Sequence, residues 1–246
     1  LFNFLVDAID VLRPAHHLGL DIGLLELAPQ CLATLGNERL PFGAARRQQA
    51  ADIPVLQRFQ LPESQVFEDI TPRIADLDGN GSNEIIAIRA SREGGAAVAL
   101  YGLVEGSLRE VGAGSENGRP NRWLNIAGLI PRPDGGLTLY GVRTPHIGGR
   151  LFSLDYGAGA VSERNEIELD LTNHVIGSRE LGLSVAGEFD GRFELTIPSQ
   201  DRQRLRFPLS GRPDIILPAP VDKAIALVDG AIVTATGRGE LLVIRP

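Results

Sequence analysis

Short apolar runs separated by turn residues recur along most of the chain. Three such runs follow closely after residue 83, at 84–89, 96–103 and 108–111, with glycine and charged residues between them. Runs of about four to eight apolar or alternating residues that are bounded by turn residues are typical of β-strands. The pattern therefore predicts an all-β fold.

The strand pattern is repeated along the chain. Segment 74–88 aligns without gaps with segment 126–140, and a third copy at 185–197 has a loop that is two residues shorter. The copies share an apolar-alanine step, at Ala75, Ala127 and Ala186. The steps between these alanines are 52 and 59 residues, a spacing that suits a four-stranded propeller blade with generous loops.

The C-terminal segment repeats the strand pattern with a shorter connection. Two apolar runs, 224–228 and 231–235, are joined by Asp229 and Gly230. Asp-Gly is a preferred pair for a two-residue type I′ hairpin turn. We therefore count this segment as a fourth copy whose first loop has been reduced to a tight turn.

These repeats predict one propeller domain. Residues 66–246 hold the four legible copies, whereas residues 1–65 are expected to supply one or two degenerate blades or closing strands, with 22–27 and 55–59 as candidate strands. The expected architecture is a β-propeller of four-stranded antiparallel blades, about five in number.

One loop carries oxygen-bearing side chains at alternate positions. These residues are Asp76, Asp78, Asn80, Ser82 and Glu84. A hard divalent cation takes about six to eight oxygen ligands, which a loop supplies when alternate residues turn inward around glycines such as Gly79 and Gly81. The spacing matches the first part of an EF-hand loop, but the twelfth position is Ala87 and the flanking residues are typical of strands. The alternative is an Asx-rich turn without metal; we favour calcium, because three acids within nine residues repel one another.

The motif at 74–84 resembles the FG-GAP, or VCBS, repeat. The signature of that family is an Asp-x-Asp-Gly-Asp-Gly-x-x-Asp/Glu loop after an apolar-alanine step, and Ile74-Ala-Asp-Leu-Asp-Gly-Asn-Gly-Ser-Asn-Glu84 carries it here. Such repeats look like blades of β-propellers, including the integrin α-subunit head. The resemblance implies calcium held between the first two strands of a blade.

The other copies have lost part of the motif. In the gapless alignment, the second copy has Gly128, Ile130, Arg132 and Gly136 at the ligand positions, so we expect no metal there. In the third copy Glu188, Asp190 and Glu194 survive in the shorter loop. Whether that loop binds a second metal is left open.

The predicted propeller gathers a second set of polar residues on the face opposite the calcium loop, where second-to-third strand loops and inter-blade linkers meet. The candidate ligand residues are Arg122, Trp123, Arg143, His146, His174, Arg179 and Glu180. Equivalent positions on the inner strands, Asp69, Asn121 and Glu180, would form a polar ring at the channel mouth. Such a face suits a sugar or a carboxylate. Alternatively, these side chains only cap the blades, and Trp123 packs in the core.

Composition narrows the class of partner. The net charge is −7 and no run of Lys or Arg occurs, so the chain lacks the basic surface that nucleic acid or an anionic membrane requires. No apolar stretch is long enough to span a bilayer, and we expect no membrane insertion. Cys31 is the single cysteine, so no intrachain disulfide can form.

These observations favour a non-enzymatic, calcium-stabilised binding module that is periplasmic or secreted and binds a glycan or a protein partner. The alternative is a polysaccharide lyase or hydrolase that uses His146, His174 and Glu180 for acid–base chemistry. A subunit of a larger assembly is a third possibility. Convergence of the three side chains in a deep cleft would favour catalysis, and a shallow polar rim would favour binding, because propellers host both.

Overall fold

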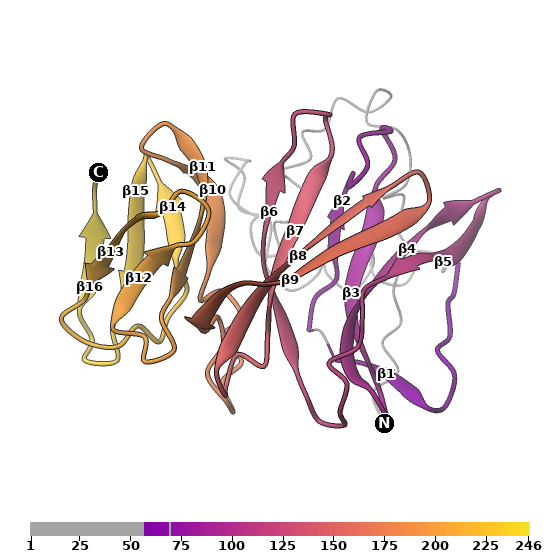
Figure 1. Cartoon of the computed structure of the whole chain (residues 1–246), viewed down its shortest axis with the longest axis horizontal. Helices are drawn as coiled ribbons and strands as arrows, with labels where there is room; N and C mark the ends of the chain where they lie inside the picture. Colours follow the sequence, from indigo (N-terminus) through magenta and orange to yellow (C-terminus); the bar gives the residue numbers. More distant parts are fainter. Residues whose placement is uncertain (1–56, 69) are drawn as a thin grey trace, which may run out of the picture.

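The computed structural model describes residues 57–68 and 70–246 (Figure 1). Most of the predicted N-terminal blade segment 1–65, namely residues 1–56, therefore lies outside the described residues. Candidate strand 22–27 and Asp69 lie outside them too. Residues 57–59, the described part of candidate strand 55–59, are irregular. None of the described residues belongs to a helix long and apolar enough to cross a bilayer.

The described chain forms four antiparallel sheets, which confirms the predicted all-β class. The first sheet contains β1 (Gln65–Phe67), β2 (Arg73–Ala75), β3 (Glu84–Ser91), β4 (Gly95–Val104) and β5 (Ser107–Ala113). Both β1 and β2 pair with β3, β1 with its end and β2 with its start, so together they occupy one strand position. The sheet is thus a four-position meander in chain order.

The remaining sheets repeat the same meander. The second sheet consists of β6 (Leu124–Pro131), β7 (Leu137–Arg143), β8 (Gly149–Gly157) and β9 (Ala160–Leu171). The third consists of β10 (Val185–Phe189), β11 (Arg192–Pro198), β12 (Arg204–Phe207) and β13 (Arg212–Ile216). The fourth has three strands, β14 (Ala226–Val228), β15 (Ala231–Ala235) and β16 (Leu241–Ile244).

Local signals placed most strands correctly. The predicted runs 84–89, 96–103 and 108–111 fall within β3, β4 and β5. Asp229 and Gly230 join β14 to β15 with φ angles of 49° and 72°, as a type I′ turn requires.

The gapless alignment of the first two copies does not hold in three dimensions. Ala75 pairs with Glu84 across the first hairpin, and the alignment would pair Ala127 with Gly136. Instead, β6 runs on to Pro131, which pairs with Leu137. The second connection is a tight five-residue turn, 132–136, and residues 128 and 130 lie in the strand rather than in a loop. The register differs because the second connection closes on itself through a hydrogen bond from Arg132 N to Gly136 O (2.8 Å).

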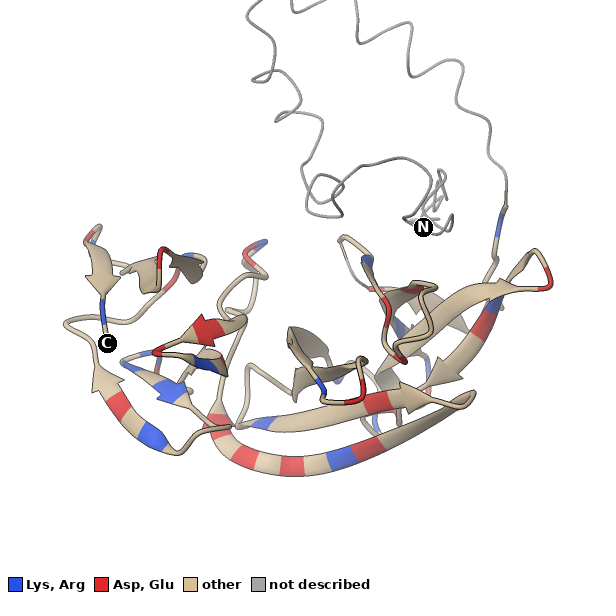
Figure 2. Ribbon diagram, turned by 90° about the horizontal axis from the view of Figure 1, so that it is seen from above, with Lys and Arg blue, Asp and Glu red and all other residues tan. Residues whose placement is uncertain are grey.

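Neighbouring sheets pack face to face through three apolar layers. The layer between the first and second sheets includes Ile86, Leu100, Leu124, Phe152 and Leu154, all at most 1% exposed. A second layer joins the second and third sheets, and a third joins the third and fourth. Seen from above, the sheets follow one another along an arc (Figure 2). Burial of these side chains is the main favourable contribution to folding.

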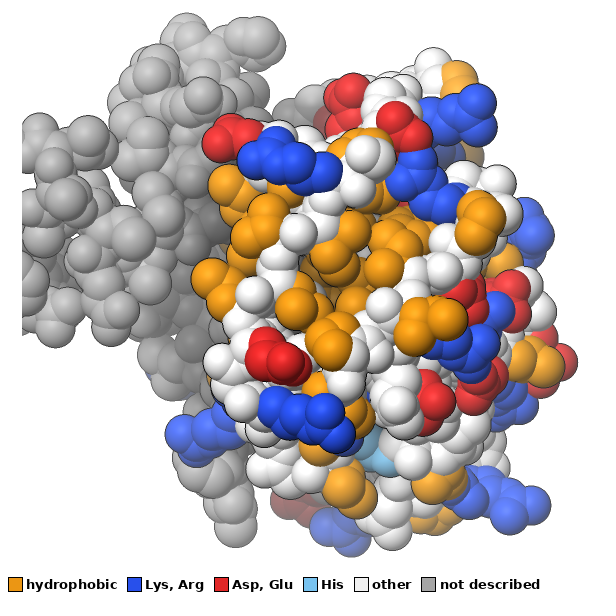
Figure 3. Space-filling view, turned by 90° about the vertical axis from the view of Figure 1, so that its left-hand side faces the viewer, with side chains coloured by type: hydrophobic (Ala, Val, Ile, Leu, Met, Phe, Trp, Pro, Cys, Tyr) orange, Lys and Arg blue, Asp and Glu red, His pale blue; other side chains and the backbone are white. Residues whose placement is uncertain are grey.

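The last sheet is apolar on both faces. In β16, Leu242 and Ile244 pack toward the third sheet, whereas Leu241 and Val243 point away from it and are 73% and 57% exposed. Figure 3 shows apolar side chains gathered at this end of the molecule with charged groups around them. No other sheet of the described part of the chain covers this outer face.

Candidate functional site

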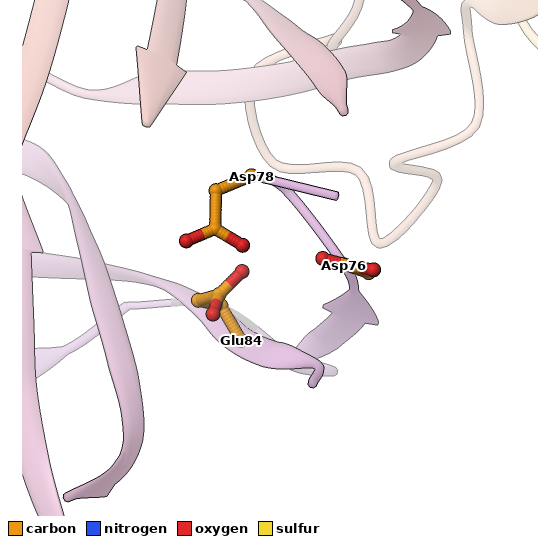
Figure 4. A group of neighbouring side chains, drawn as sticks. All are labelled: Asp76, Asp78 and Glu84. Atoms are coloured by element: carbon orange, nitrogen blue, oxygen red, sulfur yellow. The ribbon is translucent and has the colours of Figure 1, made fainter. Parts of the chain in front are cut away.

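The acidic loop, residues 76–84, brings three carboxylates together between β2 and β3. Asp76 follows β2 directly, and Glu84 begins β3 opposite Ala75. One carboxylate oxygen from each of Asp76, Asp78 and Glu84 lies within 4.8 Å of the other two. Figure 4 shows the carboxylates of Asp78 and Glu84 turned toward each other, with Asp76 beside them.

Backbone amides fix the shape of the acidic loop. Asp76 Oδ1 accepts hydrogen bonds from Gly79 N (2.8 Å) and Asn80 N (3.1 Å), and its Oδ2 accepts one from Gly81 N (2.8 Å). The glycines have φ angles of +75° and +88°, which residues with a side chain rarely adopt. The carboxylate of Asp76 therefore stabilises the turn by accepting hydrogen bonds from three backbone amides.

Glu84 is the buried member of the group, at 5% exposure. Its Oε2 accepts a hydrogen bond from Leu77 N (2.9 Å). Burial raises the pKa of Glu84, and the charges of Asp78 and Asp76 raise it further, against the lowering effect of the Leu77 amide. No described Lys, Arg or His forms an ion pair with any of the three carboxylates. Among the described residues, the group therefore gathers acidic side chains without an ion-pair partner.

The predicted ligands Asn80 and Ser82 are positioned differently. Asn80 donates from Nδ2 to Asp78 Oδ2 (2.9 Å), and its Oδ1 accepts from Ser82 N (2.7 Å). Both residues are exposed. The structure thus brings the three predicted acidic ligands together, and Asn80 and Ser82 order the outer half of the loop; coordination by Asn80 or by the Ser82 carbonyl stays a prediction.

The donor set of the acidic loop fits a hard cation. Two oxygens bound to one calcium, each about 2.3–2.6 Å from it, lie at most about 5 Å apart. The separation limit of 4.8 Å among the three carboxylates meets that requirement without movement of the backbone. One oxygen from each carboxylate supplies three of the roughly six to eight ligands that calcium prefers, and water can supply others.

In the second sheet a guanidinium occupies the corresponding turn. In this arginine hairpin, residues 131–137, Arg132 Nε donates to Asp134 Oδ1 (3.0 Å), and Nη1 donates to Asp155 Oδ1 (3.1 Å) and Leu137 O (3.1 Å). The hydrogen bond with Asp134 is the largest cause of the raised pKa of Arg132, and it also lowers the pKa of Asp134. This turn carries its own cation.

In the third sheet the surviving acids are separated. Asp190 lies in a two-residue turn and forms an ion pair with Arg212, and Glu188 is exposed on β10. Glu194 is 3% exposed, and its Oε1 accepts from Leu195 N (2.8 Å) and Leu209 N (3.2 Å). Among residues 57–68 and 70–246, Asp76, Asp78 and Glu84 form the only metal-type group of three.

On the opposite face, the structure brings the two predicted histidines together. His146 follows β7 and His174 follows β9, and His146 Nε2 lies 2.6 Å from His174 Nδ1. Because the carbonyl of Ser178 can only accept, His174 donates from Nε2 to it (2.9 Å), so its Nδ1 is the acceptor for His146. Trp123 stacks on His146 at a centroid distance of 5.3 Å. Burial lowers the pKa of both histidines, and for His146 the neighbouring His174 lowers it further.

The other predicted residues of this face are spread out. Arg143 is 7% exposed and donates to Asn165, Asn117, Ser115 and Glu163, so its guanidinium ties the strands together. Glu180 accepts from Gly182 N (2.7 Å) and does not hydrogen-bond to either imidazole. Arg179 is exposed, and Arg122 lines a cavity. A role for these residues in ligand binding stays a prediction.

Two further arginines line the same cavity, Arg119 and Arg150, and the sequence analysis did not single them out. Arg119 lies three residues before Arg122 in the same linker, so the cluster of basic residues was visible. Arg150 could be added only once the β7–β8 loop had been placed.

No protein-family model matches the chain, and neither does any curated protein.

Proposed function

We propose that this chain is a calcium-stabilised β-propeller module that works outside the cytoplasm by binding a glycan or a protein partner. The single observation that carries the calcium part is the convergence of Asp76, Asp78 and Glu84 within 4.8 Å, with no ion-pair partner in the described part of the chain. Like charges held this close destabilise the fold unless a cation joins them. The FG-GAP-like spacing of the loop agrees with this reading.

The sheet arrangement supports the propeller part. Each sheet is a meander, and the sheets follow one another along an arc (Figure 2). The first strands of neighbouring sheets lie against each other, β10 against β6 and β14 against β10. Small residues line the inner contacts: a Cβ built on Gly128 of β6 would lie 2.4 Å from the Cβ of Ala186 in β10. Close approach at the inner strands, with bulky layers farther out, suits sheets that converge on an axis.

Binding is favoured over catalysis by the geometry of the opposite face. The acid–base alternative required Glu180 beside both histidines, but Glu180 bonds to the backbone of Gly182 while the two imidazoles bond to each other. Trp123 covers the histidine pair. A packed, internally satisfied pair fits a supporting role better than a reactive one.

The exposure of the acidic loop supports the proposed location outside the cytoplasm. Asp76 and Asp78 are half-buried, and Gly79 to Ser82 are exposed, so water competes for the cation. Calcium sites of extracellular modules have dissociation constants of about 10⁻⁴–10⁻³ M. A site of that affinity is filled at millimolar calcium and empty at the concentrations of a resting cytoplasm.

Thermal unfolding in calcium, in magnesium and in chelator tests this function. We expect calcium to raise the melting temperature, by a free energy of about 2.7 kcal/mol at a hundredfold excess over the dissociation constant. Magnesium should act less, because it prefers a tighter octahedral shell with several waters. Identical melting curves in calcium and chelator would remove the metal from the proposal.

A further inference from the structure

A cavity of about 570 Å³ lies on the face opposite the acidic loop. It is bounded by linker 114–123, which joins β5 to β6, and by the β7–β8 loop 144–148. Pockets that hold small ligands have volumes of about 300–1,000 Å³. The cavity is therefore large enough for a ligand the size of a sugar.

Positive charge dominates the wall of this cavity. Arg119, Arg122 and Arg150 line it, and none of its described lining residues is an Asp or Glu. Arg150 forms an exposed ion pair with Glu166 (3.0 Å). The guanidinium groups of Arg119 and Arg122 have neither a hydrogen-bond nor an ion-pair partner among the described residues, unlike those of Arg89, Arg132, Arg143, Arg204, Arg206 and Arg212. The cavity wall is therefore locally positive, although the net charge of the chain is −7.

The backbone that presents these two arginines is fixed in place. Asn117 Nδ2 donates to Arg122 O (3.1 Å) and Trp123 O (2.9 Å), and Ala96 N donates to Arg122 O (2.9 Å). The linker also rests directly on Gly95, where an added Cβ would lie 2.3 Å from Arg119 O. A rigid backbone reduces the conformational entropy that a ligand must remove on binding.

The opposite wall combines a strained residue with an apolar one. Thr144 has a φ of +50°, which is rare for a β-branched residue, and its amide donates to Trp123 O (2.8 Å). Such conformations persist where the surrounding structure holds them, and they gather at binding sites. Ile147, three residues later, is 60% exposed at the cavity.

We propose that this cavity binds a small organic anion that carries a carboxylate, phosphate or sulfate group. The guanidinium groups of Arg119 and Arg122 hold the oxyanion, since their planar donors match its oxygens. Ile147 covers an apolar part of the ligand. The inference rests on the proposed binding role of the chain and names the ligand chemistry for it.

Titration calorimetry on the full chain with four sugar probes tests the inference. Glucuronate, glucose 6-phosphate and glucose 6-sulfate carry the three oxyanions, and glucose is the neutral reference. We expect at least one anionic probe to bind at millimolar concentration or tighter and glucose not to bind. The identity of the anion that binds distinguishes the three chemistries. Absence of binding by all three anions, or equal binding of glucose, overturns the inference.

Two arginine variants locate the site. Arg122→Ala removes a guanidinium that makes no hydrogen bond or ion pair with the described residues, so the variant should keep the melting temperature and lose roughly ten- to a hundredfold in affinity. Arg192→Ala, an exposed arginine on the other face, should change the affinity less than twofold. Unchanged affinity in Arg122→Ala contradicts the assignment. If calcium raises the melting temperature but no anion binds, only this inference is contradicted. If an anion binds but calcium does not raise the melting temperature, only the proposed calcium site is contradicted.

Discussion

The acidic loop of the first sheet and the arginine hairpin of the second lie against each other at one end of the molecule. Leu137 N donates to Leu77 O (3.0 Å), and a Cβ on Gly79 would lie 2.9 Å from the carbonyl carbon of Gly135. One turn gathers three carboxylates without a cation, and the other closes around the guanidinium of Arg132. The arginine hairpin carries its cation in the chain, whereas we propose that the acidic loop takes one from solution.

The largest expected effect tests whether the acidic loop needs a bound cation. Asp78→Ala removes one of the three carboxylates, so in 10 mM calcium we expect a loss of up to about 2.7 kcal/mol of unfolding free energy, and in chelator little or no loss. Chemical denaturation in both conditions measures it. Glu188→Ala, an exposed acid of the third sheet, is the matched control and should show no calcium dependence. Equal destabilisation of Asp78→Ala in chelator would mean that the residue acts through the turn alone.

The second prediction tests whether Arg132 stabilises the arginine hairpin independently of calcium. Arg132→Ala removes the hydrogen bonds to Leu137 O and Asp155 Oδ1, and we expect a loss of about 2 kcal/mol that is the same in calcium and in chelator. Arg109→Ala on β5, an exposed arginine, should cost less than about 0.5 kcal/mol. A calcium-dependent loss in Arg132→Ala would show that the two turns do not differ in the way we describe.

The contact between the two turns gives a third, smaller effect. Gly79 and Gly81 both have positive φ, but a Cβ on Gly79 meets the backbone of Gly135 and Gly136, whereas one on Gly81 meets open space. Both alanine substitutions introduce backbone strain, but only the new methyl group of Gly79→Ala clashes with its surroundings. We therefore expect Gly79→Ala to be less stable than Gly81→Ala by about 1 kcal/mol. Equal stability of the two variants contradicts direct packing of the acidic loop on the arginine hairpin.

The smallest expected effect concerns the opposite face. The pKa of His146 and of His174 is lowered in the folded chain from 6.5, so the unfolded chain binds protons first as the pH falls. The stability that the neutral pair contributes is present above about pH 6.5 and is lost as the pH falls through the folded pKa values. Denaturation between pH 5 and 8 should show this slope, and it should become flatter in His146→Gln. An unchanged slope in the variant assigns the pH dependence to other groups.

The sequence predicted what local chemistry determines. Strands β3, β4 and β5 follow from their apolar runs, the Asp229-Gly230 turn from its residue types, and the gathering of Asp76, Asp78 and Glu84 from their alternate spacing. Each of these features depends on residues that are close together in the chain.

Features set by packing between distant segments were not predictable in the same way. The register of β6 and β7 depends on how the turn at Arg132 closes, which the alignment with the acidic loop concealed. The role of Arg143 depends on Asn117 in the β5–β6 linker and on Glu163 and Asn165 in β9, two segments that are distant from it in the chain. The hydrogen bond between His146 and His174 joins residues 28 positions apart.

Anomalous diffraction from crystals grown in millimolar calcium tests the central claim most directly. We predict one calcium peak among the carboxylates of Asp76, Asp78 and Glu84 and none at the arginine hairpin, where Arg132 already supplies the positive charge. An empty acidic loop in such crystals would contradict the account.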